Sequence, residues 1–389
     1  MPSLLVGLSA WIAFSNTLTG DYPGDAAPAI EALIHGHLHA YLASEPAMGP
    51  FATLAQAPFA ALGATHLAEY QWASFACLLA LAALGLYLAR LAGRRGAPRA
   101  SQVLLPLLCL LNPLTFAAIE TGHPEELLTA ALAVAAVAGA AEGHGTRAAI
   151  LLGLGVASKQ WAVIAIFPTL MALPARRMRC GLLAGFVTVA LMLPGLIAAP
   201  ESFFNVQGHA ASGGGIATIW SAWYPVTSEV TLHFDGGLTG TVHQLPSWLE
   251  ALTHPLIVGL VFAIPLALWA RRGRFGLAGN EAMALLALLA LVRCALDPVD
   301  NLYYHAPLLL ALIGWDAMTA DRLPLRALAG MAVALFFHSW SRHLGDLQDF
   351  NAVYLVAIGV TAILVTKSLS GHASKRTRKP TPTLLTGRA

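Results

Sequence analysis

The sequence predicts an all-α, polytopic transmembrane bundle, and three observations support this prediction. Only 11% of the 389 residues are charged and 57% are hydrophobic, whereas a soluble domain carries roughly 25% charged residues. Apolar blocks of about 20 residues, the length needed to cross a bilayer, recur along the chain. The lysines and arginines gather in alternate connecting segments, as the positive-inside rule requires. The chain is therefore expected to fold in lipid.

Ten apolar blocks are candidates for full membrane spans. They cover residues 3–18, 70–91, 101–118, 124–141, 181–199, 254–271, 278–296, 303–319, 324–340 and 351–370. Two shorter blocks, 148–158 and 161–173, flank Lys159 and predict a hairpin of two short helices that meet there. The first block has no basic lead and no Ala-x-Ala site after it, which favours a retained span over a cleaved signal peptide.

The basic residues also predict the orientation of the chain. If both termini are cytoplasmic, every lysine and arginine except Lys159, Arg293 and Arg342 falls on the cytoplasmic side. The long segments 19–69 and 200–253 contain neither residue type and are expected to face outward. The basic tail, residues 371–389, is expected to lie on anionic membrane lipid, and we do not expect nucleic-acid binding.

We expect one membrane-embedded domain, residues 1–370, with two outward elaborations. Segment 19–69 predicts two surface helices: one capped by Asp25 and running to about Leu42, and another over 51–62 after the break at Gly49 and Pro50. Segment 200–253 predicts loops with a short hairpin near 229–234. Its larger aromatic residues are expected to anchor it at the membrane interface; they are Trp220, Trp223, Tyr224 and Trp248.

The sequence indicates no metal centre and no cofactor. The four cysteines, Cys77, Cys109, Cys180 and Cys294, lie in apolar blocks or at their ends, where a thiol behaves as a small hydrophobic group. Neither a G-x-G-x-x-G nor a P-loop pattern is present. Glu31, His35 and His39 would share one helix face, but this spacing alone is a weak indication of metal binding, and the polar face of a surface helix is the preferred interpretation.

Two aspartates are the candidate catalytic residues. Asp21 and Asp25 follow the first span at its outer end, where a carboxylate can meet both a lipid head group and a water-borne acceptor. A general base must reach the hydroxyl proton that it removes. The alternative is structural: a helix cap and a solvated loop acid.

Further polar residues at the outer surface are candidates for substrate contact. They are Glu120, His123 and Glu125 between two spans, and Asp297, Asp300, Tyr304 and His305 before another. The structural alternatives are a polar turn whose acids favour a helix N-terminus and a proline turn with interfacial aromatic residues.

The three cations that violate the inside rule are candidates to bind an anionic phosphate. Charges within a membrane are costly and indicate function by default. Arg293 and Arg342 would bind through a guanidinium fork and Lys159 as a point charge. The alternative is that they form structural ion pairs with acids such as Asp297.

Five segments together resemble the glycosyltransferase-C superfamily of polytopic membrane enzymes. They are GDYPGDAAPAIEALIHGHLHAY, EPAMGPFATLAQAPF, NPLTFAAIETGHPEELL, GLGVASKQWAVIAIFP and DPVDNLYYHAPLLL. The resemblance covers most of residues 1–320. It is closest to bacterial, especially actinobacterial, mannosyltransferase-like proteins that use polyprenyl-phosphate sugars.

The resemblance implies an inverting enzyme of the bacterial plasma membrane with its active site outside. Its donor would be a polyprenyl-phosphate hexose, typically mannose, and its acceptor a glycan or glycolipid hydroxyl. The family's base is an aspartate of the first outer loop, and only Asp21 or Asp25 matches it here. A cation such as Lys159 would stabilise charge on the departing phosphate.

Two other classes of function remain as alternatives. One is a transporter or flippase of a lipid-linked or small solute, and the other is a non-catalytic envelope assembly protein with the same fold. Transporters often show internal repeats and charges at the membrane midplane. This sequence shows no repeat and places its polar groups at one face, which favours the enzyme.

Overall fold

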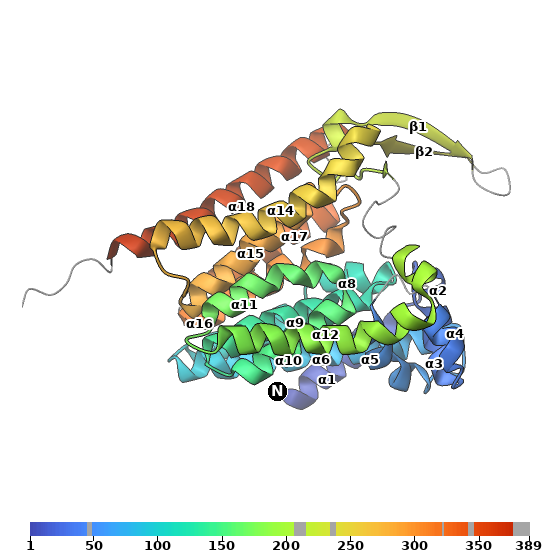
Figure 1. The fold of residues 1–389 in the computed structure, drawn as a ribbon, viewed down its shortest axis with the longest axis horizontal. Coiled ribbons are helices and arrows are strands. Elements are labelled where there is room, and N and C mark those ends of the chain that lie inside the picture. Colours follow the sequence, from blue (N-terminus) through green and yellow to red (C-terminus); the bar gives the residue numbers. More distant parts are fainter. Residues whose placement is uncertain (45–48, 206–214, 234–238, 321–322, 341–345, 376–389) are drawn as a thin grey trace, which may run out of the picture.

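The computed structural model of the chain describes residues 1–44, 49–205, 215–233, 239–320, 323–340 and 346–375 (Figure 1). Two predicted features lie outside these residues: Arg342, one of the three cations that violate the inside rule, and most of the basic tail.

Helices form the whole N-terminal half of the chain. In order they are α1 (Pro2–Ser15), α2 (Tyr22–Asp25), α3 (Ala27–Ile34), α4 (Leu38–Ala43), α5 (Pro50–Ala60), α6 (His66–Arg94), α7 (Arg99–Leu110), α8 (Pro113–Glu120), α9 (Pro124–Ala141), α10 (Gly145–Ser158), the 3-10 helix η1 (Gln160–Ala165), α11 (Ile166–Ala172) and α12 (Arg177–Ala198).

The C-terminal half adds further helices and one small hairpin. Its elements are η3 (Tyr224–Val226), β1 (Ser228–His233), β2 (Thr239–Gln244), α14 (Ser247–Arg272), α15 (Gly279–Leu296), η4 (Leu302–His305), α16 (Ala306–Thr319), α17 (Leu325–Leu335), the π-helix η5 (Phe336–Trp340) and α18 (Leu347–Lys375). The two strands pair antiparallel, with Ser228 opposite Gln244. The predicted hairpin is therefore confirmed.

The all-α transmembrane prediction is confirmed. Among the described residues, seven helical stretches are long and apolar enough to cross a membrane: α6, α7 with α8, α9, α12, α14, α15 and α18. All ten predicted blocks are helical, but α1 and α16 have only 14 residues each and α17 has 11 before its π-helical turn. The predicted short helices do meet at Lys159, between α10 and η1.

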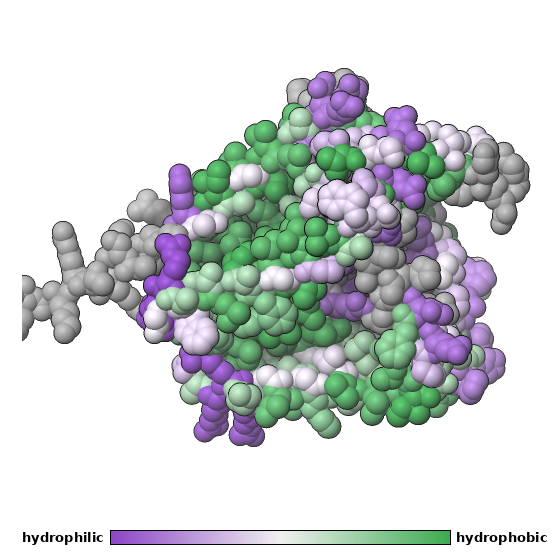
Figure 2. All heavy atoms as spheres, turned by 45° about the horizontal axis from the view of Figure 1, so that its top comes forward, coloured by the Kyte–Doolittle hydropathy of each residue, from purple (hydrophilic) through white to green (hydrophobic). Residues whose placement is uncertain are grey.

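Polar side chains are concentrated at two opposite ends of the molecule. Hydrophobic residues fill the middle of the surface in Figure 2, and hydrophilic residues gather toward its left and right ends. At one end Arg95 pairs with Glu142 (3.0 Å) and donates to the carbonyl of Met318 (3.1 Å). Arg95, Glu142 and Met318 lie in or beside three connecting segments that were predicted to be cytoplasmic, and these segments therefore lie together.

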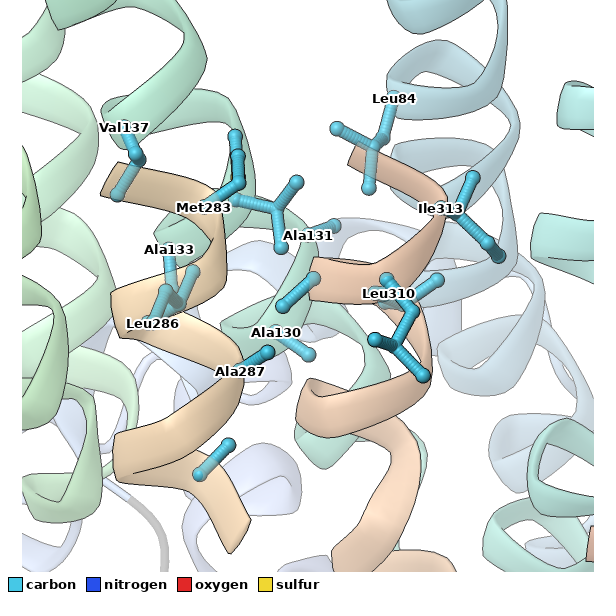
Figure 3. Close-up of a cluster of buried hydrophobic side chains, with 14 of the residues drawn as sticks. Leu84, Ala130, Ala131, Ala133, Val137, Met283, Leu286, Ala287, Leu310 and Ile313 are labelled. Carbon is cyan, nitrogen blue, oxygen red and sulfur yellow. The ribbon is translucent and has the colours of Figure 1, made fainter. Parts of the chain in front are cut away.

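A tightly packed core holds the end of α9 in place. Small residues of α9, such as Ala130 and Ala133, face larger ones from α15 and α16, such as Leu286 and Leu310 (Figure 3). Helices within a membrane associate through close van der Waals packing, which small residues permit. The polar N-terminus of α9 is thereby fixed relative to α15, and both contribute to the site described below.

The first outer segment differs from its prediction. Asp25 is the last residue of α2 and does not cap a helix, because Ala26 holds the position before α3. Gly36 then adopts a positive φ of +70°, a conformation that ends a helix. The expected single helix from Asp25 to about Leu42 is therefore two short helices, α3 and α4.

The expected shared face of Glu31, His35 and His39 is also wrong, because Gly36 separates the last of them from α3. Glu31 instead contacts His66 at 3.1 Å. The second predicted surface helix is present as α5, which begins at Pro50 as expected.

Gly20 and Gly122 allow the first outer segment to lie directly against the turn between α8 and α9. The backbone N–H of Asp21 donates to the carbonyl of Thr121 (3.0 Å). Gly122 has a φ of +90°, and a Cβ there would lie 2.5 Å from the carbonyl oxygen of Thr19 and 2.6 Å from the nitrogen of Asp21. Only glycine permits this approach.

We expect Gly122→Ala to destabilise the protein far more than Gly143→Ala. Both glycines have positive φ, but a Cβ at Gly143 would meet open space. The control should cost about 1–2 kcal/mol from backbone strain alone. Gly122→Ala should cost roughly 3 kcal/mol or more, because overpacking is added. Thermal unfolding in detergent measures both, and equal losses would contradict the close approach.

Candidate active site

Two adjacent carboxylates at the start of α9 form the centre of the site. Glu125 and Glu126 are 0% and 1% exposed. Pro124 at the first helical position and acids in the first turn fit a helix N-terminus, whose dipole favours negative charge. Buried charges are nevertheless costly unless they are paired, so these two residues require cationic partners.

Lys159 supplies the first cation. Its Nζ lies 3.0 Å from Oε1 of Glu125 and 3.6 Å from Oε1 of Glu126. Lys159 has an extended backbone between α10 and η1, which interrupts the helix and turns its side chain toward α9. The preceding carbonyl, that of Ser158, accepts the N–H of Gly49 (2.7 Å). The start of α5 is therefore tied to the lysine.

Arg293 supplies the second cation from the outer end of α15. Its Nη2 lies 3.8 Å from Oε1 of Glu126. Its guanidinium lies over the rings of Trp161 and Tyr304, 4.9 and 4.3 Å from their centroids, so both rings stabilise the charge by cation–π contact. Trp161 also donates to Glu126 (2.8 Å). Among the described residues, Nη1 of Arg293 has no hydrogen-bond partner.

His123 connects these acids to the first outer segment. Its Nδ1 lies 3.2 Å from Oε1 of Glu125 and its Nε2 lies 3.2 Å from Oδ2 of Asp21. The ring stacks on Tyr303 at 4.9 Å. Burial alone would lower the pKa of His123, but the hydrogen bond and the charge of Glu125 outweigh burial and leave the pKa raised. His123 therefore bridges two carboxylates, and Glu125 favours its protonated form.

The two candidate bases have different surroundings. The side chain of Asp21 is 72% exposed and is held by His123. Asp25 is half-buried, and burial raises the pKa of its carboxyl group, although the nearby charges of His123 and Lys159 oppose the shift. Asp25 thus lies within electrostatic reach of the buried cations and has the greater proton affinity that a base needs.

We call Asp21, His123, Glu125, Glu126, Lys159 and Arg293 the outer ion cluster. Its two fixed cations, Lys159 and Arg293, pair with its two buried glutamates, and His123 bridges Glu125 and Asp21. Both described misplaced cations therefore form ion pairs, with Glu125 and Glu126 in place of the expected Asp297. Oε2 of Glu125 has no hydrogen-bond partner among the described residues, so the cluster contains one buried acceptor and, on Arg293, one buried donor that are not paired within it.

The remaining predicted residues lie around this cluster. Tyr304 contacts Arg293, as described above. Asp297 ends α15 and accepts the N–H of Val299 (3.1 Å). Glu120 ends α8 with an exposed side chain.

Asp300 and His305 belong to a second buried group with Tyr354 of α18. The hydroxyl of Tyr354 lies 2.9 Å from Nε2 of His305 and 3.3 Å from Oδ2 of Asp300. Trp220 packs on His305 and Tyr354, so it anchors this group and not the membrane interface. Trp248, in contrast, is 68% exposed.

Four residues of these groups were not among the predicted site residues. Glu126 belongs to the same polar turn as Glu125 but was not chosen, and Trp161 lies two positions from Lys159, so both motifs contained the signal. Tyr303 precedes a chosen tyrosine, but its stacking on His123 depends on tertiary structure. Tyr354 lies in the last span, 49 residues from His305, and no local pattern marks it.

Two cavities open near these groups. The larger, about 600 Å³, lies between α15, α16, α17 and α18 and is almost entirely apolar, with Trp220, His305 and Tyr354 among its lining residues. The smaller, about 230 Å³, lies between α4, α5 and α12 and is lined by Tyr41, Gly49 and Pro50. Gly49, which lines the smaller cavity, donates its backbone N–H to Ser158, the residue before Lys159.

Comparison with known proteins identifies a family and a fold. Residues 49–292 match glycosyltransferase family 87. The chain also resembles the crystal structure of ArnT from Cupriavidus metallidurans bound to undecaprenyl phosphate, with a TM-score of 0.52 and 17% identity. That match covers 95% of this chain and 71% of ArnT. No curated protein matches the chain significantly.

We expect Lys159→Met to destabilise the protein by about 3–5 kcal/mol, because it leaves a buried glutamate unpaired. Adding Glu125→Gln should recover most of that loss, since the unpaired charge is removed. Arg94→Met, which breaks a pair that is 63% exposed on the arginine side, should cost no more than about 1 kcal/mol. Unfolding in detergent measures these variants, the single Glu125→Gln variant and wild type, and full additivity in the double variant would contradict a direct pair.

Proposed function

Because the chain belongs to glycosyltransferase family 87, we propose that it transfers a hexose from a polyprenyl-phosphate-linked donor to an extracytoplasmic hydroxyl. Mannose is the first candidate sugar, and a glycan or glycolipid of the bacterial envelope is the acceptor. The observation that carries the proposal is the position of Asp25, which faces the outer ion cluster at the end of the membrane-spanning bundle. Family membership favours this enzyme over the transporter.

The fold supports a lipid-linked donor. The ArnT structure contains undecaprenyl phosphate, and this chain offers a mostly apolar cavity between α4, α5 and α12, whose lining residue Gly49 is hydrogen-bonded to Ser158, the residue before Lys159. A prenyl chain can lie among such side chains while its phosphate reaches the cluster from the bilayer. The sugar would then project toward the first outer segment, which lies over the same end of the bundle (Figure 1).

Asp25 is the preferred base. It would remove the acceptor proton as the hydroxyl oxygen attacks the anomeric carbon, and the bond from that carbon to the phosphate oxygen would break on the opposite face. The configuration is therefore inverted. Asp21 would act indirectly, because it holds His123 and thereby fixes the positive charge that faces Asp25.

The cations would stabilise the departing phosphate by donating hydrogen bonds to it and not by an excess of positive charge. Glu125 and Glu126 already balance Lys159 and Arg293, but the open Nη1 of Arg293 can donate to a phosphate oxygen. Donors held in place before the reaction stabilise developing charge without reorganisation. Oε2 of Glu125 is available to accept a sugar hydroxyl. We propose Asp297 and Tyr304 as neighbours of the phosphate and Glu120 as an acceptor contact at the surface.

We expect Asp25→Asn to reduce transfer by about 10²–10⁴-fold, the range of general-base catalysis. Asp21→Asn should retain more activity, and Asp349→Asn, which changes an exposed acid of α18, should leave it unchanged. The assay follows release of polyprenyl phosphate by purified protein supplied with polyprenyl-phosphate mannose or glucose.

Full activity in both first-segment variants would refute the catalytic role of this segment. Envelope glycans of a deletion strain, analysed by mass spectrometry, identify the acceptor through the missing hexose. Intact glycans with accumulation of a solute would instead support transport. Donor binding without any product would support the non-catalytic assembly protein.

The activity should also fall at acidic pH, because Asp25 acts as a base only when its carboxyl group is ionised. The pKa of Asp25 is raised, so the midpoint of this fall should lie above 3.8, the ordinary pKa of an aspartate. His123→Ala removes a positive charge that lowers this pKa, so the limb should move to higher pH. His66→Ala, at an exposed position, should not move it. The pH profile of kcat/KM measures the shift, and a limb that moves to lower pH would contradict the assignment.

A further inference from the structure

The second buried group contains three potential metal ligands from different parts of the outer surface. Sγ of Cys294, a carboxylate oxygen of Asp300 and a ring nitrogen of His305 all lie within 4.8 Å of one another. Oδ2 of Asp300 is 3.5 Å from Nε2 of His305, a separation close to the ligand–ligand edge of a tetrahedron with bonds of about 2.0–2.1 Å. Neither Cys294 nor Asp300 is accessible to solvent.

One oxygen of this group has no partner. Oδ1 of Asp300 is buried and lacks a hydrogen bond to any described residue. The nearest fixed cation is Arg293, but its ion pair is with Glu126 of the outer ion cluster. A buried carboxylate oxygen without a donor is rare and costly, so the site is electrostatically incomplete.

His305 is oriented as a metal ligand would be. Its Nδ1 lies 3.1 Å from the carbonyl oxygen of Leu302, and a carbonyl can only accept, so Nδ1 carries the proton. Nε2 is then the bare nitrogen, and it points to Asp300 and Tyr354. A backbone carbonyl that fixes the tautomer in this way is the usual outer partner of a metal-bound histidine.

We propose that Cys294, Asp300 and His305 bind a zinc ion, with the Tyr354 hydroxyl or a water at the fourth position. A thiolate, an imidazole and a carboxylate are together a ligand set that suits zinc. Binding releases the thiol proton of Cys294. The two negative ligands then neutralise the two charges of the ion, so the filled site suits a medium of low dielectric constant.

The zinc site would fix one wall of the catalytic region. Cys294 lies at the end of α15 and His305 ends η4, so the ion would fasten the turn between them. That turn carries Tyr303, which stacks on His123, and Tyr304, which lies under Arg293. His305 also lines the larger cavity. The assignment does not depend on the sugar, the donor or the base proposed above.

Metal content of the full chain purified in detergent tests the proposal directly. After incubation with zinc sulfate and removal of loose ions, wild-type protein should contain about one zinc per chain. Cys294→Ser and His305→Gln should each lower this by about 10-fold or more. Two matched controls should retain the metal: Cys180→Ser removes another thiol, and His66→Ala disrupts the exposed group with Glu31 and Glu69.

Cobalt substitution provides a second measurement that does not depend on the stability of a variant. Wild-type protein loaded with Co²⁺ should show thiolate-to-cobalt charge-transfer absorption, and this band should be absent from Cys294→Ser but present in Cys180→Ser. The proposal is overturned if wild-type protein binds no zinc. It is also overturned if the zinc is lost with His66→Ala and kept with His305→Gln, or if bound cobalt shows no thiolate band.

Discussion

Burial of two neighbouring carboxylates at the start of α9 is the constraint on which the outer end of this protein depends. Glu125 and Glu126 have no access to water, so they require fixed positive partners. Lys159 and Arg293 meet this requirement from two other parts of the chain, and His123, two residues before Glu125, adds a hydrogen bond. The helix break at Lys159 and the aromatic rings around Arg293 are consequences of holding those partners in place.

The same charges organise the first outer segment. His123 is bonded on one side to Glu125 and on the other to Asp21, and the glycines beside Asp21 let the backbone approach closely enough for that contact. Asp25 is carried into the field of the buried cations as a result. Packing of α9 within the bundle and the position of the proposed base are therefore connected through one histidine.

Hydropathy was sufficient to predict the membrane helices, because lipid requires long apolar stretches. The positions of the charges were sufficient to predict which connecting segments lie together at one end of the bundle. They also identified most of the polar residues of the site. They did not identify partners: Lys159 was expected to be open to phosphate, whereas Glu125 and Glu126 occupy it, and Tyr354 joins Asp300 from the last helix. The break at Gly36 was missed because its left-handed backbone overrides a continuous apolar pattern. Pairing across distant helices leaves no local trace in a single sequence.

The charge balance of the outer ion cluster bears on how a spent carrier would leave. A pocket with surplus positive charge would retain a prenyl phosphate tightly, and turnover would wait on its escape. With the donor bound as proposed, both cations would still be paired with the buried glutamates, so surplus positive charge would not hold back the departing phosphate.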